Sequence, residues 1–230
     1  MDNQPADLEA LKSLKIGAFT AAEIVTERSG VTGEKMELSD YVWLKGAKVD
    51  AYNHLGNKLS SIVVADSAEA DAETVHGINM QVASMAPVAL DADHVAQEVK
   101  DRELAVALDK TKQDEINKAI EQALRKAGIN PAHADSDDHI ASNTTKGWLT
   151  PEQADEARQI RANVPAEAEA NLNMKKIEMI AQGRLAKFLK ESTLLEQQYI
   201  MSDEKELVKD VLKKTNVTIT DFKRITLNQE

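Results

Sequence analysis

The 230 residues of the chain, of which 42% are hydrophobic and only 3% aromatic, are enough for a core of aliphatic and small side chains. The net charge of −11 argues against direct nucleic-acid binding, because an acidic surface repels phosphate backbones. The absence of cysteine excludes disulfides, thiolate zinc sites and cysteine nucleophiles. No apolar run approaches the roughly 20 residues that a membrane helix requires, so we expect a cytoplasmic protein without membrane contact.

The first part of the chain is expected to be helical and then to form one strand. Leu8, Leu11 and Leu14 recur at helical spacing within the first 30 residues. The run TAAE at residues 20–23 has the pattern of a capping box, which marks a helix start. The apolar pattern then changes, and residues 36–44 are expected to form a strand.

A β-hairpin and a helix are expected next. The strands would span residues 48–53 and 59–65, joined by residues 54–57 (HLGN), whose glycine and asparagine suit a tight turn. A helix over residues 68–85 would end before Pro87. The positions expected to be buried on the strands are Val49, Ile62, Val63 and Val64, and those expected to share one helix face are Val75, Ile78, Val82 and Met85.

Residues 94–127 carry the strongest helical pattern in the chain. Such a helix would be roughly 50 Å long, too long to be buried in a domain of this size, so it must project. Its partner is expected to be a second amphipathic helix over residues 174–190. The two helices together would form an antiparallel coiled-coil hairpin. The polar residues 128–171 would decorate the hairpin tip, with short helices near 135–142 and 151–163.

The C-terminal part is expected to return to the sheet. Ser202 would cap a helix over residues 203–214, and a last strand would span residues 217–227. The order of hairpin, helix, long insertion, helix and strand predicts an α+β fold. We expect a small antiparallel three-stranded sheet covered by helices, with a long inserted antiparallel coiled-coil hairpin.

The strongest candidate for chemistry is the run HADSDDH at residues 133–139, which could ligate a divalent metal and support a metal-dependent enzyme. It matches no zinc spacing and lacks the central glycine of a calcium loop, which favours a charged loop that caps a short helix. No histidine has a serine and a carboxylate at a triad spacing. Trp148 either anchors a partner or packs the hairpin tip onto itself. We expect no enzyme activity, no catalytic residue and no cofactor.

Several short segments stand in the order of one known family. The match covers roughly residues 7–127 and 172–228, and its long middle insertion is similar to the form in Bacteroidetes-type bacteria. The family is elongation factor Ts. Residues 75–83 (VHGINMQVA) resemble the helix with which that factor binds its partner, and residues 95–104 (VAQEVKDREL) resemble the start of its coiled coil. Residues 182–188 (QGRLAKF) and 194–200 (LLEQQYI) resemble the end of that coiled coil, and residues 221–224 (DFKR) resemble its last core strand.

The resemblance implies a guanine-nucleotide exchange factor of translation. Such a factor binds elongation factor Tu, disturbs the magnesium and phosphate contacts of that partner, and speeds GDP release. The family often has histidine where Gln81 stands and an Ile-Gly pair where Leu59 and Ser60 stand. Carried over by position, the partner-binding residues would be Leu59, Ser60, His76, Met80, Gln81, Ile200 and Met201.

The resemblance also implies a division into parts. Residues 1–46 would be the remnant of a first core subdomain, residues 47–93 and 191–230 the second core subdomain, and residues 94–190 the inserted coiled-coil hairpin with its helical tip at 128–171. The opening hairpin of the first subdomain, the Thr-Asp-Phe-Val motif that should follow it, and the N-terminal three-helix domain would be missing. We therefore expect a fragment with reduced exchange activity.

Two expectations concern self-association. An unpaired strand edge invites pairing with another chain, so we expect a tendency to form a homodimer through residues 36–44. The alternative function from a different class is a coiled-coil structural or adaptor protein that self-associates and does not bind elongation factor Tu.

Overall fold

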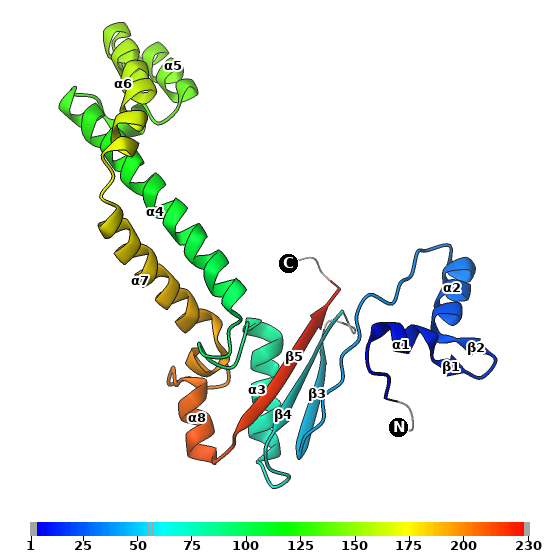
Figure 1. The fold of residues 1–230 in the computed structure, drawn as a ribbon. Coiled ribbons are helices and arrows are strands. Elements are labelled where there is room, and N and C mark those ends of the chain that lie inside the picture. The colour runs from blue at the N-terminus through cyan, green and yellow to red at the C-terminus, as the bar shows by residue number, and fades with distance from the viewer. Residues whose placement is uncertain (1–3, 55, 57, 228–230) are drawn as a thin grey trace. The chain divides into compact units, whose positions relative to one another are not determined.

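The computed structural model describes residues 4–54, 56 and 58–227. The chain divides into two compact units, which are described separately below: unit 1 comprises Met1–Ala92 and Ser192–Glu230, and unit 2 comprises Asp93–Glu191. Unit 1 contains the β-structure and unit 2 is helical in the residues described. Figure 1 shows the order of the helices and strands, which confirms the predicted α+β fold class.

A three-stranded antiparallel sheet is the centre of unit 1. It consists of β3 (Lys48–His54), β4 (Leu59–Ala65) and β5 (Ile219–Thr226), in the order β3-β4-β5. The hairpin β3–β4 confirms the sequence prediction. In its expected turn Gly56 has a φ of 64°, the left-handed conformation that favours glycine, whereas Leu55 and Asn57 lie outside the described residues. The last strand begins two residues later than predicted, because the Val217 amide donates to Leu212 and closes the preceding helix.

Helix α3 (Ala72–Met85) covers one face of this sheet and is itself covered on its other side. It begins four residues later than predicted, because Asp71 caps it by accepting a hydrogen bond from the Thr74 amide at 2.8 Å. Its buried apolar residues join β4, β5 and the C-terminal helix in one core. That core contains Val63, Ala65, Val75, Ile78, Val82, Leu194, Val208, Leu212 and Ile219.

The prediction that Val49 is buried was wrong, since its side chain is 45% exposed. Val49 lies opposite Val64 in the β3–β4 ladder, and therefore on the sheet face that points away from α3. The face toward α3 carries Ser61 and Val63. Met85 is also exposed, because it lies in the last turn of α3.

The N-terminal stretch is not one continuous helix. Helix α1 (Leu8–Ser13) is followed by the two-residue strands β1 (Lys15–Ile16) and β2 (Phe19–Thr20), which form a tight hairpin around Gly17 at a φ of 69°. The predicted capping box is confirmed, because Thr20 and Glu23 exchange hydrogen bonds at the start of α2 (Ala21–Thr32). The strand predicted over residues 36–44 was wrong: this segment is not a strand, since none of the strands among the described residues lies beside it.

Unit 2 contains the predicted antiparallel helical hairpin. Helix α4 (Gln97–Lys126) and helix α7 (Met174–Ser192) run side by side in Figure 1. Two ion pairs join them: Lys176 Nζ lies 2.6 Å from Glu115, and Arg184 Nη2 lies 2.6 Å from Asp114. The long helix begins at Gln97 instead of residue 94, and Ala96 in front of it offers no side-chain cap.

The hairpin tip has a small core of its own. It is formed by the 3-10 turn η1 (Pro131–His133), α5 (Asp137–Thr145) and α6 (Pro151–Ala170), which packs on α4. The predicted capping box of Thr150 and Gln153 is confirmed, but α6 continues past its predicted end at residue 163 and through Pro165 to Ala170. The core of the tip consists of Leu124, Ile129, Ala134, Ile140, Leu149, Ala154 and Ala157.

The C-terminal helix was predicted five residues too early. After the turn η2 (Leu194–Glu196), α8 (Val208–Thr215) begins at Val208 and not at residue 203. Ser202 accepts a hydrogen bond from the Glu204 amide, which forms a local turn and not a helix start. Among the residues that the structure describes, no helix is both long enough and apolar enough to cross a membrane.

Candidate partner-binding site

A compact loop over residues 198–207 presents two apolar side chains at its tip. Gln198 and Leu207 close it through an antiparallel bridge, and the Tyr199 amide donates to the Glu206 carbonyl at 2.8 Å. Ile200 and Met201 follow at the tip and are 41% and 59% exposed. Exposed apolar side chains on an ordered loop are typical of a surface that binds another protein.

Gln81 of α3 fixes the position of this loop. Its side chain is fully buried, at 0% exposure. Its amide nitrogen donates to Gln197 Oε1 and to the Gln198 carbonyl, each at 3.1 Å, and its amide oxygen accepts from the Ile200 amide at 2.8 Å. The structure therefore places Gln81 behind Ile200, with its side chain buried. Sequence reasoning could not find Gln197, because it lies 116 residues from Gln81.

The ring of Tyr199 packs against α3 at Gly77. A Cβ atom at position 77 would overlap the Tyr199 hydroxyl oxygen and lie 3.1 Å from the ring carbon that carries it. Burial raises the pKa of the Tyr199 hydroxyl, and the nearby charge of Glu73 adds to this effect. Sequence reasoning missed this contact. The one feature of the sequence that pointed to this contact is a glycine inside a helix, where glycine is unfavourable unless another group needs the space.

An exposed ion pair closes the base of the loop, where Glu206 pairs with Lys214 of α8 and accepts a hydrogen bond from Ser202. The hydrogen bond to Lys214 lowers the pKa of Glu206, and Glu206 in turn raises the pKa of Lys214.

We predict that the loop loses order at both extremes of pH. A lowered carboxylate pKa stabilises the fold above the usual value of 4.5, and this contribution is lost as the pH falls through the folded-state pKa. The raised lysine pKa stabilises below 10.5, and this contribution is lost as the pH rises through the folded-state pKa. Amide exchange at Tyr199, corrected for intrinsic exchange, should show both losses, and Glu206→Gln should show neither. An identical pH profile in that variant would contradict the assignment.

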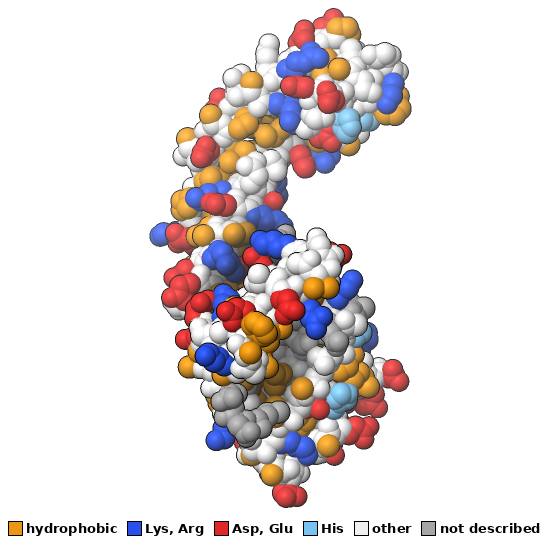
Figure 2. All heavy atoms as spheres, turned by 90° about the vertical axis from the view of Figure 1, so that its right-hand side faces the viewer, with side chains coloured by type: hydrophobic (Ala, Val, Ile, Leu, Met, Phe, Trp, Pro, Cys, Tyr) orange, Lys and Arg blue, Asp and Glu red, His pale blue; other side chains and the backbone are white. Residues whose placement is uncertain are grey.

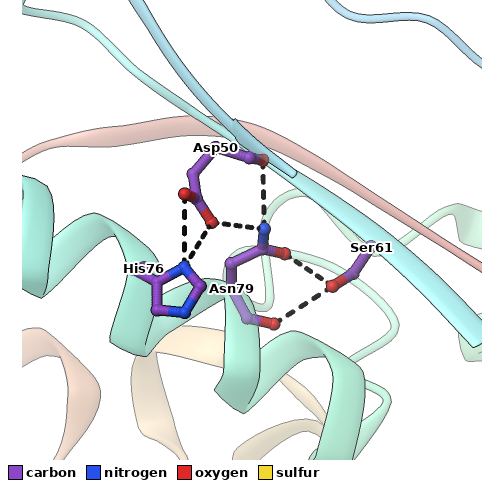
Figure 3. Close-up of polar contacts among 4 residues, drawn as sticks. All are labelled: Asp50, Ser61, His76 and Asn79. Atoms are coloured by element: carbon purple, nitrogen blue, oxygen red, sulfur yellow. Dashed lines mark hydrogen bonds and ion pairs between the residues drawn. The ribbon is translucent and has the colours of Figure 1, made fainter. Parts of the chain in front are cut away.

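A polar network joins α3 to the sheet (Figure 3). Asn79 donates to the Asp50 carbonyl at 3.0 Å and to Asp50 Oδ2 at 2.7 Å, and Ser61 donates to Asn79 Oδ1 at 2.6 Å. His76 Nδ1 lies 3.0 Å from Asp50 Oδ2. Because Asn79 and Ser61 are buried, the network fixes the rotation of α3 and leaves His76 at the surface.

This network is not a catalytic triad, although it contains a serine, a histidine and an aspartate. Ser61 is 1% exposed and donates to Asn79 and not to His76. A triad requires the histidine to accept the proton of an accessible serine, and this arrangement provides neither contact nor access. The geometry supports positioning of α3 and not nucleophilic catalysis.

Leu59 and Ser60 lie at the same end of α3 as Met80 and Gln81. Ser61 contacts Asn79, and Arg224, opposite Ser61 in the β4–β5 ladder, donates to the Ala83 carbonyl at 3.0 Å. The strand start therefore lies beside the C-terminal half of the helix. Leu59 is buried, whereas Ser60 is half-buried and donates to Asn53 Oδ1 at 2.7 Å. Met80 is half-buried.

The run at residues 133–139 forms a capped helix start. Ser136 accepts from the His139 amide and caps α5, and His139 Nδ1 is hydrogen-bonded to Asp135. His133 lies against Trp148, with ring centroids 5.2 Å apart. In the described part of the chain, no group of three or more acidic or histidine side chains is arranged to hold a metal ion. Trp148 contacts the tip through this ring pair and is 59% exposed, and its expected role as a partner anchor stays a prediction.

Comparison with known proteins gives one consistent result. The family model described as "Elongation factor TS" matches residues 1–229. The chain is 49% identical to the elongation factor Ts of Phocaeicola vulgatus and 47% identical to that of Bacteroides fragilis. Each match covers 99% of this chain and 69% of the relative. It is also 31% identical to the elongation factor Ts of Porphyromonas gingivalis, over 100% of this chain and 64% of the relative. The chain therefore belongs to the elongation factor Ts family of translation factors.

Proposed function

We propose that this chain binds elongation factor Tu and promotes the release of GDP from it. The observation that carries the proposal is the presentation of Ile200 and Met201. A fully buried amide on α3 holds the backbone on both sides of Tyr199, so that the two apolar side chains after it stay ordered and exposed. Such an ordered apolar anchor costs little conformational entropy on binding.

The proposed contact surface combines three elements of unit 1. Met80 of α3, Ser60 of β4, and Ile200 and Met201 of the loop would touch the partner, and His76 would extend the surface along α3. Leu59 and Gln81 would support this surface from within unit 1 without touching the partner, because both side chains are buried. This assignment modifies the contact set expected from family resemblance, in which Leu59 and Gln81 touch the partner directly.

The mechanism would be mechanical and would need no nucleophile or general base. Binding of a rigid surface to the nucleotide-free form of elongation factor Tu favours that form over the GDP-bound form. The coupling is reciprocal, so GDP must weaken the binding of this chain by the same factor by which this chain weakens the binding of GDP. The site of action would be the cytoplasm, where translation takes place.

A GDP-release experiment tests the proposal. Elongation factor Tu loaded with a fluorescent GDP analogue is mixed with excess unlabelled GDP, and the release rate is measured at increasing concentrations of this chain. We expect the rate to rise and saturate, and we expect added GDP to weaken binding in calorimetry. An unchanged release rate at saturating concentrations of the folded chain would refute the exchange activity. Absence of any binding would refute the partner assignment as well.

A further inference from the structure

The helical tip of unit 2 contains an open cavity with a volume of about 520 Å³. Its walls are one face of α4 over residues 117–125, the turn at residues 130–132, Asp135, and Arg161 of α6. All of these residues lie within unit 2, and the tip has a hydrophobic core of its own in which α4, η1 and α6 pack together. Small-molecule sites usually have volumes of roughly 300–1,000 Å³, so this cavity is large enough to bind a small molecule.

The cavity combines an apolar part with groups of both charges. Ile120 and Leu124 of α4 and Pro131 of η1 supply the apolar part, and Leu124 is 1% exposed. Two carboxylates and two guanidinium groups line the same cavity, and they belong to Glu121, Arg125, Asp135 and Arg161. Figure 2 shows the same mixture on the surface of the tip, at the top of the view, where acidic and basic side chains lie next to one another.

The carboxylate of Glu121 and the guanidinium group of Arg125 lie side by side on α4 without a hydrogen bond between them. Glu121 Oε2 and Arg125 Nη2 are 3.9 Å apart, which is longer than a hydrogen bond between nitrogen and oxygen. Both side chains are more than half exposed, at 56% and 68%, so each can turn toward a ligand. This pair therefore offers one acceptor of positive charge and one donor to negative charge at neighbouring positions.

Arg161 adds a second guanidinium group whose position is fixed by the backbone of the tip. Its Nη1 atom donates to the Ala134 carbonyl at 3.2 Å, and Ala134 is fully buried. Among the described residues Arg161 makes no other hydrogen bond, so its remaining N–H groups can bind an acceptor. A guanidinium group that is already held in place loses less conformational entropy when it binds a carboxylate.

We infer that this cavity binds a free α-amino acid with an aliphatic side chain. An α-amino acid carries its ammonium and carboxylate groups on the same carbon atom, which matches the neighbouring carboxylate of Glu121 and guanidinium group of Arg125. The ammonium group would donate to Glu121 and the carboxylate would accept from Arg125. The aliphatic side chain would lie on Ile120 and Leu124, where it leaves water.

The same lining disfavours other common classes of ligand. A nucleotide would bring its phosphates next to the carboxylates of Glu121 and Asp135. None of the described residues in the lining is aromatic, so a base would have no ring on which to stack. A metal ion would face two guanidinium groups, and in the described part of the chain no three acidic or histidine side chains are grouped to hold one.

Nuclear magnetic resonance of the full chain tests the inference, with leucine as the probe. Leucine should shift the backbone amide signals of residues 120–135 in a saturable way, with a dissociation constant of about 1 mM, as expected for so small a ligand. N-acetyl-leucine lacks the ammonium group and leucine amide lacks the carboxylate, so each should bind at least about tenfold more weakly. No saturable shift with leucine, or equal binding of the two derivatives, would overturn the inference.

Substitutions on α4 test the two charged contacts. Glu121→Gln and Arg125→Gln should each raise the dissociation constant for leucine about tenfold, and neither should unfold the tip, because an exposed pair contributes little to stability. The matched control is Arg158→Gln on α6, which removes an exposed arginine paired with Asp155 outside the cavity and should leave the constant within about twofold. An unchanged constant in either cavity variant, or an equal loss in the control, would contradict the site. Elongation factor Tu takes no part in these titrations, so their outcome is independent of the proposed exchange activity.

Discussion

Replacing Gly77 with alanine is expected to lower the stability of unit 1 by about 1–3 kcal/mol, the usual cost of overpacking a well-packed region. The added Cβ atom would overlap the Tyr199 hydroxyl oxygen, so the ring of Tyr199 must move away from α3. This loss exceeds the gain of about 0.5–1 kcal/mol that alanine normally brings to a helix interior. Urea unfolding should measure this loss of stability. The signal is the fluorescence of Trp43 in a Trp148→Phe background, so that the only tryptophan lies in unit 1.

A second substitution separates the contact from a general effect on the helix. Tyr199→Phe removes the oxygen that the new Cβ would overlap, and the nearest remaining atom of the ring would be 3.1 Å away. Combining it with Gly77→Ala should therefore recover most of the lost stability, and Tyr199→Phe alone should change little. If the double variant is as unstable as Gly77→Ala alone, the contact with Tyr199 is not the reason for the glycine.

Replacing Met201 with aspartate is expected to weaken binding to nucleotide-free elongation factor Tu about 30-fold or more. Anchor side chains at interface centres contribute at least about 2 kcal/mol, and a carboxylate in the same place would have to lose its hydration. Met201 is 59% exposed, so the substitution leaves the core of unit 1 unchanged. Isothermal titration calorimetry measures the affinity, and the GDP-release rate at fixed concentration should fall in parallel.

Met179→Asp is the matched control for this prediction. Met179 lies on α7 of unit 2 and is 69% exposed, so the same change in charge and size occurs on a surface outside the proposed site. We expect its affinity to stay within about threefold of the original. Equal losses in both variants would show that net charge or the helical hairpin, and not the tip of the loop, determines binding.

The parts of the fold that could be predicted are those whose signals are local. The hairpin β3–β4, the long helix α4 and the capping boxes at Thr20 and Thr150 depend on residues a few positions apart. Their patterns are complete within one stretch of sequence, so no distant contact is needed to read them.

The errors arose where a distant partner decides the structure. Residues 36–44 have the composition of a strand, yet a strand exists only where a second one pairs with it. Ser202 has the appearance of a helix cap, but the chain instead closes a loop that Tyr199 and Glu206 hold together. The role of Gln81 could not be read for the same reason, because its partners lie more than 100 residues away.

The core of the tip and the core of unit 1 differ in how far apart their residues lie in the sequence. This difference determines which core forms first during synthesis. The core of the tip uses residues from Leu124 to Ala157, which leave the ribosome close together. The core of unit 1 needs Val208, Leu212 and Ile219 to cover a helix made more than 100 residues earlier. The hairpin tip therefore folds before α3 and the β3–β4 hairpin have contacted α8 and β5, and the proposed partner-binding surface forms after the tip.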